Sequence, residues 1–494
     1  MRIKSGMVSH SRVEKWLALG LLLAACGGGG DPTQPQPPVP TALAFTLQPG
    51  TALAGSPLAA PVSVEIRDGA GHRVADATIP VPLALGANPG AGVLAGTTTV
   101  NAVAGVATFA GLSINNRGRG YTLVASAGAL TNATSSAFSI AIPATFSLLD
   151  AGGGHSCGMD NGGFIHCWGR NTDGELGDGT TAQSELPTLG TLLSFATVSV
   201  GEHHTCAVTS TGDAYCWGAN TNGQVGDGTQ GNHRSSPVLV AGGLTFGRVS
   251  AGGNHTCGVT TPPASAVYCW GANDKGQLGD STHTASPTPV PVSGGLAFAA
   301  VSAGAAHNCA VALTGGAYCW GDNAQGQLGD STMTPRSYPA LVLGDPGFQE
   351  VYAGGAHTCG ITPAAVAYCW GDNAHGQLGD TTTTQRSAPV AVAGGLGFGI
   401  LRPGFQHTCG MATTQALYCW GSNSAGQLGD GTTGDRSSPV AVIGVAVPEG
   451  VLSGHDHSCA WTFDGANYCW GSNTLGRLGD GTTTSSSLPV GVLY

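Results

Sequence analysis

The feature that most constrains the fold is a motif that occurs seven times at a nearly fixed interval. Each copy has a His, a Cys two residues later, and a second Cys ten or twelve residues further on that is followed by Trp-Gly. Self-similarity at a fixed period of this length indicates a repeat architecture, and it outweighs local propensities. The first cysteines of the seven copies lie 49 to 52 residues apart, at Cys157, Cys206, Cys257, Cys309, Cys359, Cys409 and Cys459.

Each unit has the pattern of one β-blade. In HTCAVTSTGDAYCWGANTNGQVGDGT, which starts at His204, two short strands flank a Gly-containing turn, and a turn-rich segment and a Pro-Val strand follow. Units of about four strands arranged radially make a propeller. The motifs AGxxHTC, AYCWGxN, GQLGDGT and SSPV resemble the repeats of the regulator of chromosome condensation family. That resemblance implies an all-β, seven-bladed β-propeller over residues 146–494.

The resemblance implies no single activity. The family includes a nuclear guanine-nucleotide exchange factor, eukaryotic scaffold proteins and a secreted bacterial β-lactamase inhibitor.

Ring closure is a separate question, because a propeller must join its first blade to its last or expose sheet edges. We expect residues 488–493 to pair alongside Ser147–Gly152; the alternative is that each repeat is one complete blade.

Residues 42–145 form a different region, without Cys or Trp. About seven short strand patterns separated by Gly, Pro and Asn turns favour a β-sandwich. The stretch GVATFAGLSINNRGRGYTLVASAG is similar to bacterial immunoglobulin-like domains, with Phe109 and Tyr121 as the expected aromatic anchors.

The amino terminus has the pattern of a bacterial lipoprotein leader. Ten apolar residues, 16–25, follow a basic stretch; they are too few to span a bilayer and suit a signal-peptide core. Leu23-Ala24-Ala25-Cys26 resembles a lipobox, in which the cysteine is lipidated and becomes the first mature residue. We therefore predict a signal peptide over residues 1–25, lipidation of Cys26, and a Gly/Pro-rich linker over residues 26–41. Gly27, rather than Asp, after the cysteine favours the outer membrane; an ordinary signal peptide is the alternative.

The cysteine count fits this compartment. The chain has 15 cysteines, so Cys26 leaves 14, two in each repeat. Counting outward from the turn places the two cysteines of a repeat opposite each other on a hairpin, close to disulfide distance. Metal binding and free packed thiols are the alternatives, but no Cys-x2-Cys knuckle is present. The predicted disulfides join Cys157–Cys167, Cys206–Cys216, Cys257–Cys269, Cys309–Cys319, Cys359–Cys369, Cys409–Cys419 and Cys459–Cys469.

Three further sets of repeated residues have a structural and a functional interpretation. For the histidines, the structural role is a bond to the turn of the same blade, and the functional one is a metal or proton site at the axis. For the aspartates of GQLGD, the choice is between turn capping and hydrolysis or calcium binding. For the tryptophans of CWG, it is between packing and stacking on sugars. Identical neighbours in every blade favour structure, because catalysis requires one site where dissimilar groups converge. The sets are His155, His204, His255, His307, His357, His407 and His457; Asp178, Asp227, Asp280, Asp330, Asp380, Asp430 and Asp480; and Trp168, Trp217, Trp270, Trp320, Trp370, Trp420 and Trp470.

The charge balance excludes nucleic acid as a partner. The net charge is -11, and Lys275 is the only lysine after the leader, so no cluster exists to neutralise phosphates. We expect a monomeric, lipid-anchored, extracytoplasmic binding or scaffold protein of the bacterial cell envelope that presents its propeller to a protein or glycan. It touches the membrane only through its lipid and has no catalytic residue, metal or cofactor.

Two other functions remain as alternatives. One is an envelope hydrolase or lyase at the propeller mouth; Glu175, where other repeats have Gln or Arg, and Asp456 beside His455 are its candidate residues. The other, by family analogy, is a guanine-nucleotide exchange factor.

Overall fold

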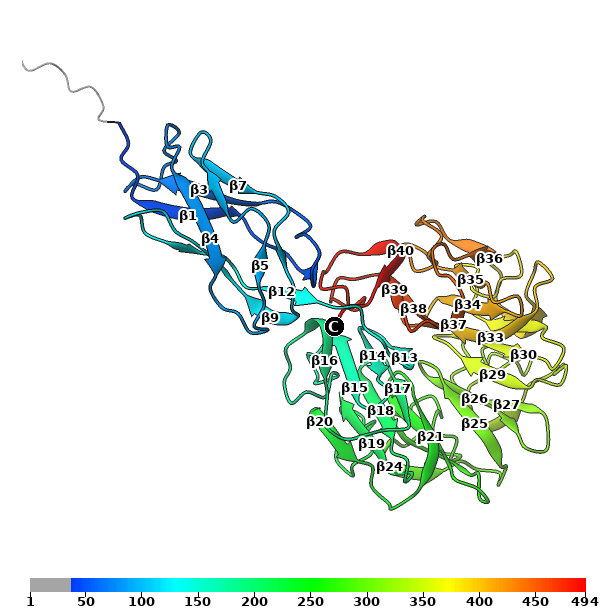
Figure 1. Ribbon diagram of the computed structural model, residues 1–494. Helices are drawn as coiled ribbons and strands as arrows, with labels where there is room; N and C mark the ends of the chain where they lie inside the picture. The colour runs from blue at the N-terminus through cyan, green and yellow to red at the C-terminus, as the bar shows by residue number, and fades with distance from the viewer. Residues whose placement is uncertain (1–36) are drawn as a thin grey trace, which may run out of the picture.

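The computed structural model describes residues 37–494. The predicted leader and lipidation site at Cys26 lie outside the described residues. Within residues 37–494, all regular secondary structure is β-strand (Figure 1), and no helix has the length and apolarity to cross a membrane.

The amino-terminal part is built from short strands in small sheets around one core. Its sheets have the strand orders β1-β3-β7, β11-β10-β4-β6, β2-β12-β9 and β5-β8. Phe109 and Tyr121 are both buried in this core, beside Val64 and Leu123. The strands are β1 (Ala42–Leu47), β2 (Ala52–Leu53), β3 (Val62–Arg67), β4 (Pro80–Leu85), β5 (Leu94–Ala95), β6 (Thr99–Asn101), β7 (Val106–Phe109), β8 (Ser113–Ile114), β9 (Gly118–Tyr121), β10 (Leu123–Ala125), β11 (Ala133–Thr134) and β12 (Phe138–Ala141).

The seven repeats form seven four-stranded antiparallel sheets, each made of consecutive strands. We number the strands of each sheet first to fourth along the chain. The first strands are β13 (Leu148–Ala151), β17 (Thr197–Val200), β21 (Phe246–Ala251), β25 (Phe298–Ala303), β29 (Glu350–Ala353), β33 (Phe398–Pro403) and β37 (Pro448–Ser453). The second strands are β14 (His155–Met159), β18 (His204–Val208), β22 (His255–Thr260), β26 (His307–Ala312), β30 (His357–Ile361), β34 (His407–Ala412) and β38 (His457–Thr462).

The third and fourth strands complete each sheet. The third strands are β15 (Ile165–Gly169), β19 (Ala214–Gly218), β23 (Val267–Gly271), β27 (Ala317–Gly321), β31 (Ala367–Gly371), β35 (Leu417–Gly421) and β39 (Asn467–Gly471). The fourth strands are β16 (Ser184–Leu189), β20 (Arg234–Leu239), β24 (Ser286–Pro291), β28 (Arg336–Leu341), β32 (Arg386–Ala391), β36 (Arg436–Ala441) and β40 (Ser486–Gly491).

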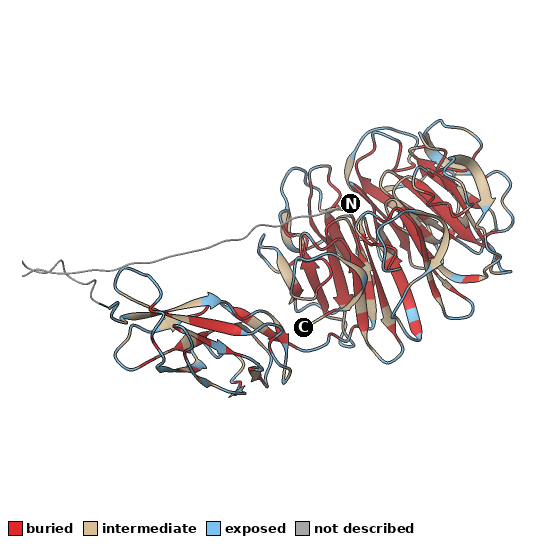
Figure 2. Ribbon diagram, turned by 90° about the horizontal axis from the view of Figure 1, so that it is seen from above, coloured by how far each residue is buried: buried red, intermediate tan, exposed pale blue. Residues whose placement is uncertain are grey.

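The sheets pack face to face in a ring. Consecutive sheets contact each other, and β37 and β38 of the last sheet pack on β13 of the first, so red and cyan ribbons meet in Figure 1. Burial is concentrated between the sheets (Figure 2). Each interface has its own apolar cluster around one tryptophan; Trp217 packs among residues of the first sheet, with Phe195 against it. The hydrophobic core is therefore divided among the interfaces between sheets.

The expected pairing of residues 488–493 with Ser147–Gly152 is wrong. β40 pairs with β39 of its own sheet, and β13 pairs with β14. Each repeat supplies all four strands of its sheet, because strands joined by short turns pair without closing a long loop.

The carboxyl-terminal residues instead hold the segment that connects the two parts of the chain. Leu493 forms a β-bridge with Pro143, and the N–H of Tyr494 donates to the carbonyl of Ile142 at 2.7 Å. Val492 is buried in the same apolar cluster as Phe146. The end of the last repeat thus anchors the segment that precedes the first repeat.

The axial mouth as a candidate binding site

A ring of glycines surrounds the propeller axis, three residues before each repeat histidine. The residue after each glycine donates its N–H to the glycine carbonyl of the adjacent sheet, at 2.9–3.2 Å. The last of these bonds, from His455 to Gly152, returns to the first sheet at 3.0 Å. A Cβ on any of these glycines would lie 1.9–2.6 Å from an adjacent carbonyl oxygen, so only glycine fits. The ring consists of Gly152, Gly201, Gly252, Gly304, Gly354, Gly404 and Gly454.

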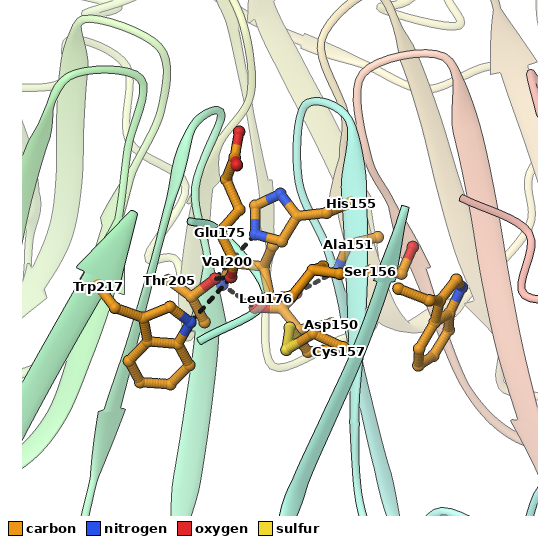
Figure 3. The surroundings of a disulfide bond; sticks show 12 residues. Asp150, Ala151, His155, Ser156, Cys157, Glu175, Leu176, Val200, Thr205 and Trp217 are labelled. Atoms are coloured by element: carbon orange, nitrogen blue, oxygen red, sulfur yellow. Dashed lines mark hydrogen bonds between the residues drawn. A yellow bond between two sulfur atoms is a disulfide. The ribbon is translucent and has the colours of Figure 1, made fainter. Parts of the chain in front are cut away.

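The repeat histidines join adjacent sheets. Nε2 of His155 lies 2.8 Å from Oγ1 of Thr205 in the next sheet, and that hydroxyl donates its only proton to the carbonyl of Glu175 (Figure 3). Nε2 therefore donates the proton of the His–Thr bond. The same contact occurs at every sheet interface, with Thr, Asn or Ser as partner. The prediction that each histidine bonds its own turn is wrong, because its side chain reaches across the interface.

Burial keeps these histidines neutral. It lowers the pKa of His155, His204, His307 and His357 to about 3, lowers that of His255 and His407 to about 4, and brings that of His457 well below its usual value. All seven rings are fully buried. Because each ring is buried and bonded across a sheet interface, these histidines have a structural role.

The cysteines and tryptophans also belong to the framework. Cys157 and Cys167 are directly opposite in register and form a disulfide with an S–S distance of 2.12 Å; the other six repeats are joined in the same way. The indole N–H of Trp217 donates to the carbonyl of Glu175, which also accepts the hydroxyl of Thr205. All seven repeat tryptophans are completely buried, so none provides a surface for sugars.

The aspartates of GQLGD cap turns. Asp178 accepts bonds from the backbone N–H and the hydroxyl of Thr180 at 2.9 and 2.8 Å, and the same Asp-Thr contact recurs in the other repeats. Several of these aspartates also pair with an arginine, as Asp380 does with Arg386 at 2.8 Å. The carboxylate oxygens of these aspartates therefore stabilise the turns in which they lie.

The repeats differ in the size and charge of their side chains around one end of the axis. The residues two before each repeat histidine line a cavity of about 100 Å³ there, together with the glycine ring. We call this opening the axial mouth. Four of its seven positions are Gly or Ala, whereas Glu202, Phe405 and His455 carry large side chains. The mouth positions are Gly153, Glu202, Gly253, Ala305, Gly355, Phe405 and His455.

The large residues of the last two repeats form a connected group. The rings of Phe405 and His455 stack with centroids 3.8 Å apart. Nδ1 of His455 lies 2.9 Å from a carboxylate oxygen of Asp456, and this bond lowers the pKa of Asp456. Asp456 is therefore an anion at neutral pH, with 40% of its side chain exposed.

A second charged group occupies the first two repeats. Arg170 lies 2.6 Å from Asp173, 3.2 Å from Glu175, and in contact with Nδ1 of His203. Glu175 has no exposed side-chain surface, and burial raises its pKa; burial lowers the pKa of His203. The oxygens and nitrogen of Asp173, Glu175 and His203 that could bind a metal lie within 4.8 Å of one another. The guanidinium of Arg170 contacts all three residues and already supplies the positive charge.

The two residues considered for hydrolysis belong to different groups of contacts. Glu175 is enclosed in its ion pair, whereas Asp456 belongs to the other group, beside His455. Sequence reasoning noticed these two as departures from the repeat but missed Glu202, Phe405 and Arg170. Aligning the repeats position by position shows each of the three as a charged or aromatic residue where most repeats have a small one. Glu202 and Phe405 line one cavity because the seven sheets are arranged in a ring.

These features define the class of protein as a β-propeller of disulfide-bonded repeats. It has a ring of glycines around its axis and a polar axial mouth. The chain belongs to the RCC1-like domain family: that domain matches residues 242–493, and the regulator of chromosome condensation (RCC1) repeat matches residues 162–208, 195–224 and 211–259.

Several known proteins are similar to this chain. Ultraviolet-B receptor UVR8 of Arabidopsis thaliana is 30% identical over 171 residues, which are 33% of this chain and 38% of that protein, so the match spans well under half of the receptor. Yeast RCC1 (Prp20), in its complex with Kap60, superposes with a TM-score of 0.60 at 20% identity, covering 67% of this chain and 83% of that one. Human WBSCR16 gives 0.59 at 21% identity, covering 66% and 89%. At these identities the two structures show the shared propeller fold.

Proposed function

We propose that this chain is a binding or scaffold protein that presents the axial mouth of a seven-bladed propeller to a protein or glycan outside the cytoplasm. The observation that carries the proposal is the distribution of the departures from the repeat. The glycine ring, histidines, disulfides and tryptophans recur in all seven sheets, whereas charged and aromatic side chains collect at the mouth. Variation confined to loops on a rigid frame is typical of recognition surfaces.

The rest of the chain attaches and orients this surface. In our proposal, residues 1–25 are a lipoprotein signal peptide, lipidated Cys26 anchors the protein in the outer membrane of a bacterium, and residues 26–41 are a spacer. Residues 42–145 form an immunoglobulin-like domain that holds the propeller of residues 146–494 away from the membrane. Seven disulfides suit the oxidising environment of the envelope.

Known relatives support binding as the function. The yeast structures concern Prp20 bound to Kap60 and its binding properties to Gsp1p and histones. Those partners are properties of that protein, but they show that an RCC1-like propeller can bind other proteins. We favour binding over hydrolysis for this chain because Glu175 is fully enclosed by its ion pair.

Affinity capture from solubilised envelopes of the host tests the proposal. The full chain is compared with an E202Q/D456N variant, which neutralises a mouth carboxylate and the carboxylate bonded to the mouth residue His455, and with E449Q, which neutralises an exposed carboxylate on β37. We expect wild type and E449Q to retain a component that the double variant loses. Retention of identical components by all three proteins would refute the mouth as the binding surface.

A further inference from the structure

The axial mouth carries a ring of backbone carbonyls with spare hydrogen-bonding capacity. Its seven residues lie between strands, so no β-ladder uses their carbonyls. Within residues 37–494, the carbonyl of Gly153 accepts a bond from Arg477, and the other six accept none from any protein donor. Each carbonyl oxygen carries two lone pairs and a partial negative charge. The mouth is therefore rich in acceptors and poor in donors.

Glycines at three of the mouth positions allow adjacent carbonyls to lie close together. A Cβ on Gly153 would lie 2.4 Å from the carbonyl oxygen of Glu202, and one on Gly253 would lie 2.4 Å from that of Ala305. A Cβ on Gly355 would lie 2.3 Å from the carbonyl oxygen of Phe405. Glycine at these positions thus makes room for the adjacent carbonyl.

A guanidinium already contacts this ring. The Nη1 of Arg477 donates to the carbonyl of Gly153 at 3.1 Å. Arg477 is 7% exposed and stands where five other repeats have glutamine and the first has Glu175. Its position shows that the planar head group of an arginine fits against the mouth carbonyls.

Side chains add negative charge and an aromatic surface. Glu202 is the carboxylate among the residues that line the cavity, and Asp456 follows the lining residue His455, to which it is bonded. Glu202 retains 30% exposure of its side chain and Asp456 retains 40%. Phe405 lines the same cavity, and the face of an aromatic ring attracts cations.

The size of the cavity limits the ligand. About 100 Å³ is well below the roughly 300–1,000 Å³ of sites for drug-sized molecules. One side-chain head group can enter, whereas a folded segment would remain on the surrounding loops.

We propose that the axial mouth binds an arginine side chain on an exposed segment of a partner protein. This inference rests on the binding function proposed above and specifies the chemistry of its ligand. The guanidinium donates to the free carbonyls, pairs with Glu202, and lies against Phe405. Arg170 and Arg477 remain in their present contacts.

Peptide titration tests the proposal with the full chain. The probes are three Gly/Ser peptides identical except for one central residue: arginine, lysine or citrulline, the neutral isostere of arginine. Ligand-observed NMR gives each Kd. We expect the arginine peptide to bind about tenfold more tightly than the citrulline peptide, and this preference to weaken at high salt.

Matched variants locate the site. E202Q should weaken arginine binding about fivefold, and E449Q should leave it within about twofold. Equal binding of the arginine and citrulline peptides, or equal losses in the two variants, would overturn the inference. Tighter binding of the lysine peptide would also overturn it, because lysine would then be the preferred ligand. The function proposed above can survive this failure, because envelope capture that depends on Glu202 and Asp456 would still identify the mouth as a binding surface.

Discussion

Nε2 of His457 lies 2.7 Å from Oγ of Ser156, although 301 residues separate them in the chain. The hydroxyl of Ser156 also lies 3.1 Å from the carbonyl of Arg477. These are the contacts that every other repeat makes with its successor, here made between the last sheet and the first. The ring is therefore closed by the same polar contacts that hold its other interfaces together.

Replacing Ser156 with Ala should destabilise the propeller. The variant leaves the buried Nε2 of His457 without its partner, at a cost of about 1–3 kcal/mol, while the carbonyl of Arg477 keeps its bond from the indole N–H of Trp168. Urea denaturation measures the free energy of unfolding. S236A is the control, since Ser236 is exposed on β20. Equal stability of S156A and wild type would show that closure does not depend on this contact.

Replacing Gly152 with Ala should also be costly. The new Cβ would lie 1.9 Å from the carbonyl oxygen of Gly201, so the interface must open, at about 3 kcal/mol. G399A on β33 adds the same methyl group where no atom lies within 4 Å. A comparison of melting temperatures in which G152A matches G399A would contradict the close packing of the ring.

The protein should lose stability in acid. The buried histidines have pKa values of about 3 to 4, below the usual value near 6.5, so the unfolded chain binds protons more readily than the folded one. The resulting stabilisation is complete above about pH 6.5 and decreases as the pH falls towards 3, by about 1.4 kcal/mol per pH unit for each histidine. Urea denaturation between pH 7 and pH 4 measures this slope. A free energy of unfolding that does not change over this range would be inconsistent with neutral buried histidines.

Each disulfide should contribute separately to stability. Replacing Cys206 and Cys216 together with Ala removes a short cross-link, at a cost of about 2–3 kcal/mol. Peptide mass spectrometry without reduction should find seven pairs, each within one repeat. Pairs between repeats, or 14 alkylatable thiols in protein taken from the envelope, would refute this arrangement.

Replacing Cys26 with Ala should release the protein from membranes. An S-diacylglyceryl group with an N-acyl chain gives lasting attachment, and the variant lacks the thiol to which the diacylglyceryl group would be joined. Fractionation of cells that produce wild type or C26A measures the change. If C26A stays with the membrane fraction, Cys26 is not the anchor.

Several elements of the fold could be predicted locally. The position of Cys206 and Cys216 around a turn indicates that they are opposite in a hairpin, and β18 and β19 have that register. The pattern VSVEIRD predicts a strand, and β3 occupies Val62–Arg67. Such predictions succeed because hairpin register and strand alternation are set by residues close in sequence.

Contacts between repeats could not be predicted in this way. The bond from His155 to Thr205 spans 50 residues, and the mouth combines Glu202 with His455 from different repeats. Nothing within a single repeat encodes these contacts, because they depend on the rotation from one sheet to the next.

The sequence alone therefore determines the repeat, its strands and the positions of the cysteines, because these depend on local spacing. Tertiary structure decides how the ring closes and which departures from the repeat become neighbours. The pairing of Tyr494 with Ile142, the bond from His455 to Gly152, and the convergence of Glu202, Phe405 and His455 at the mouth each join segments far apart in the chain. Packing of the seven sheets around one axis is the physical reason, since it brings together residues that no local pattern relates.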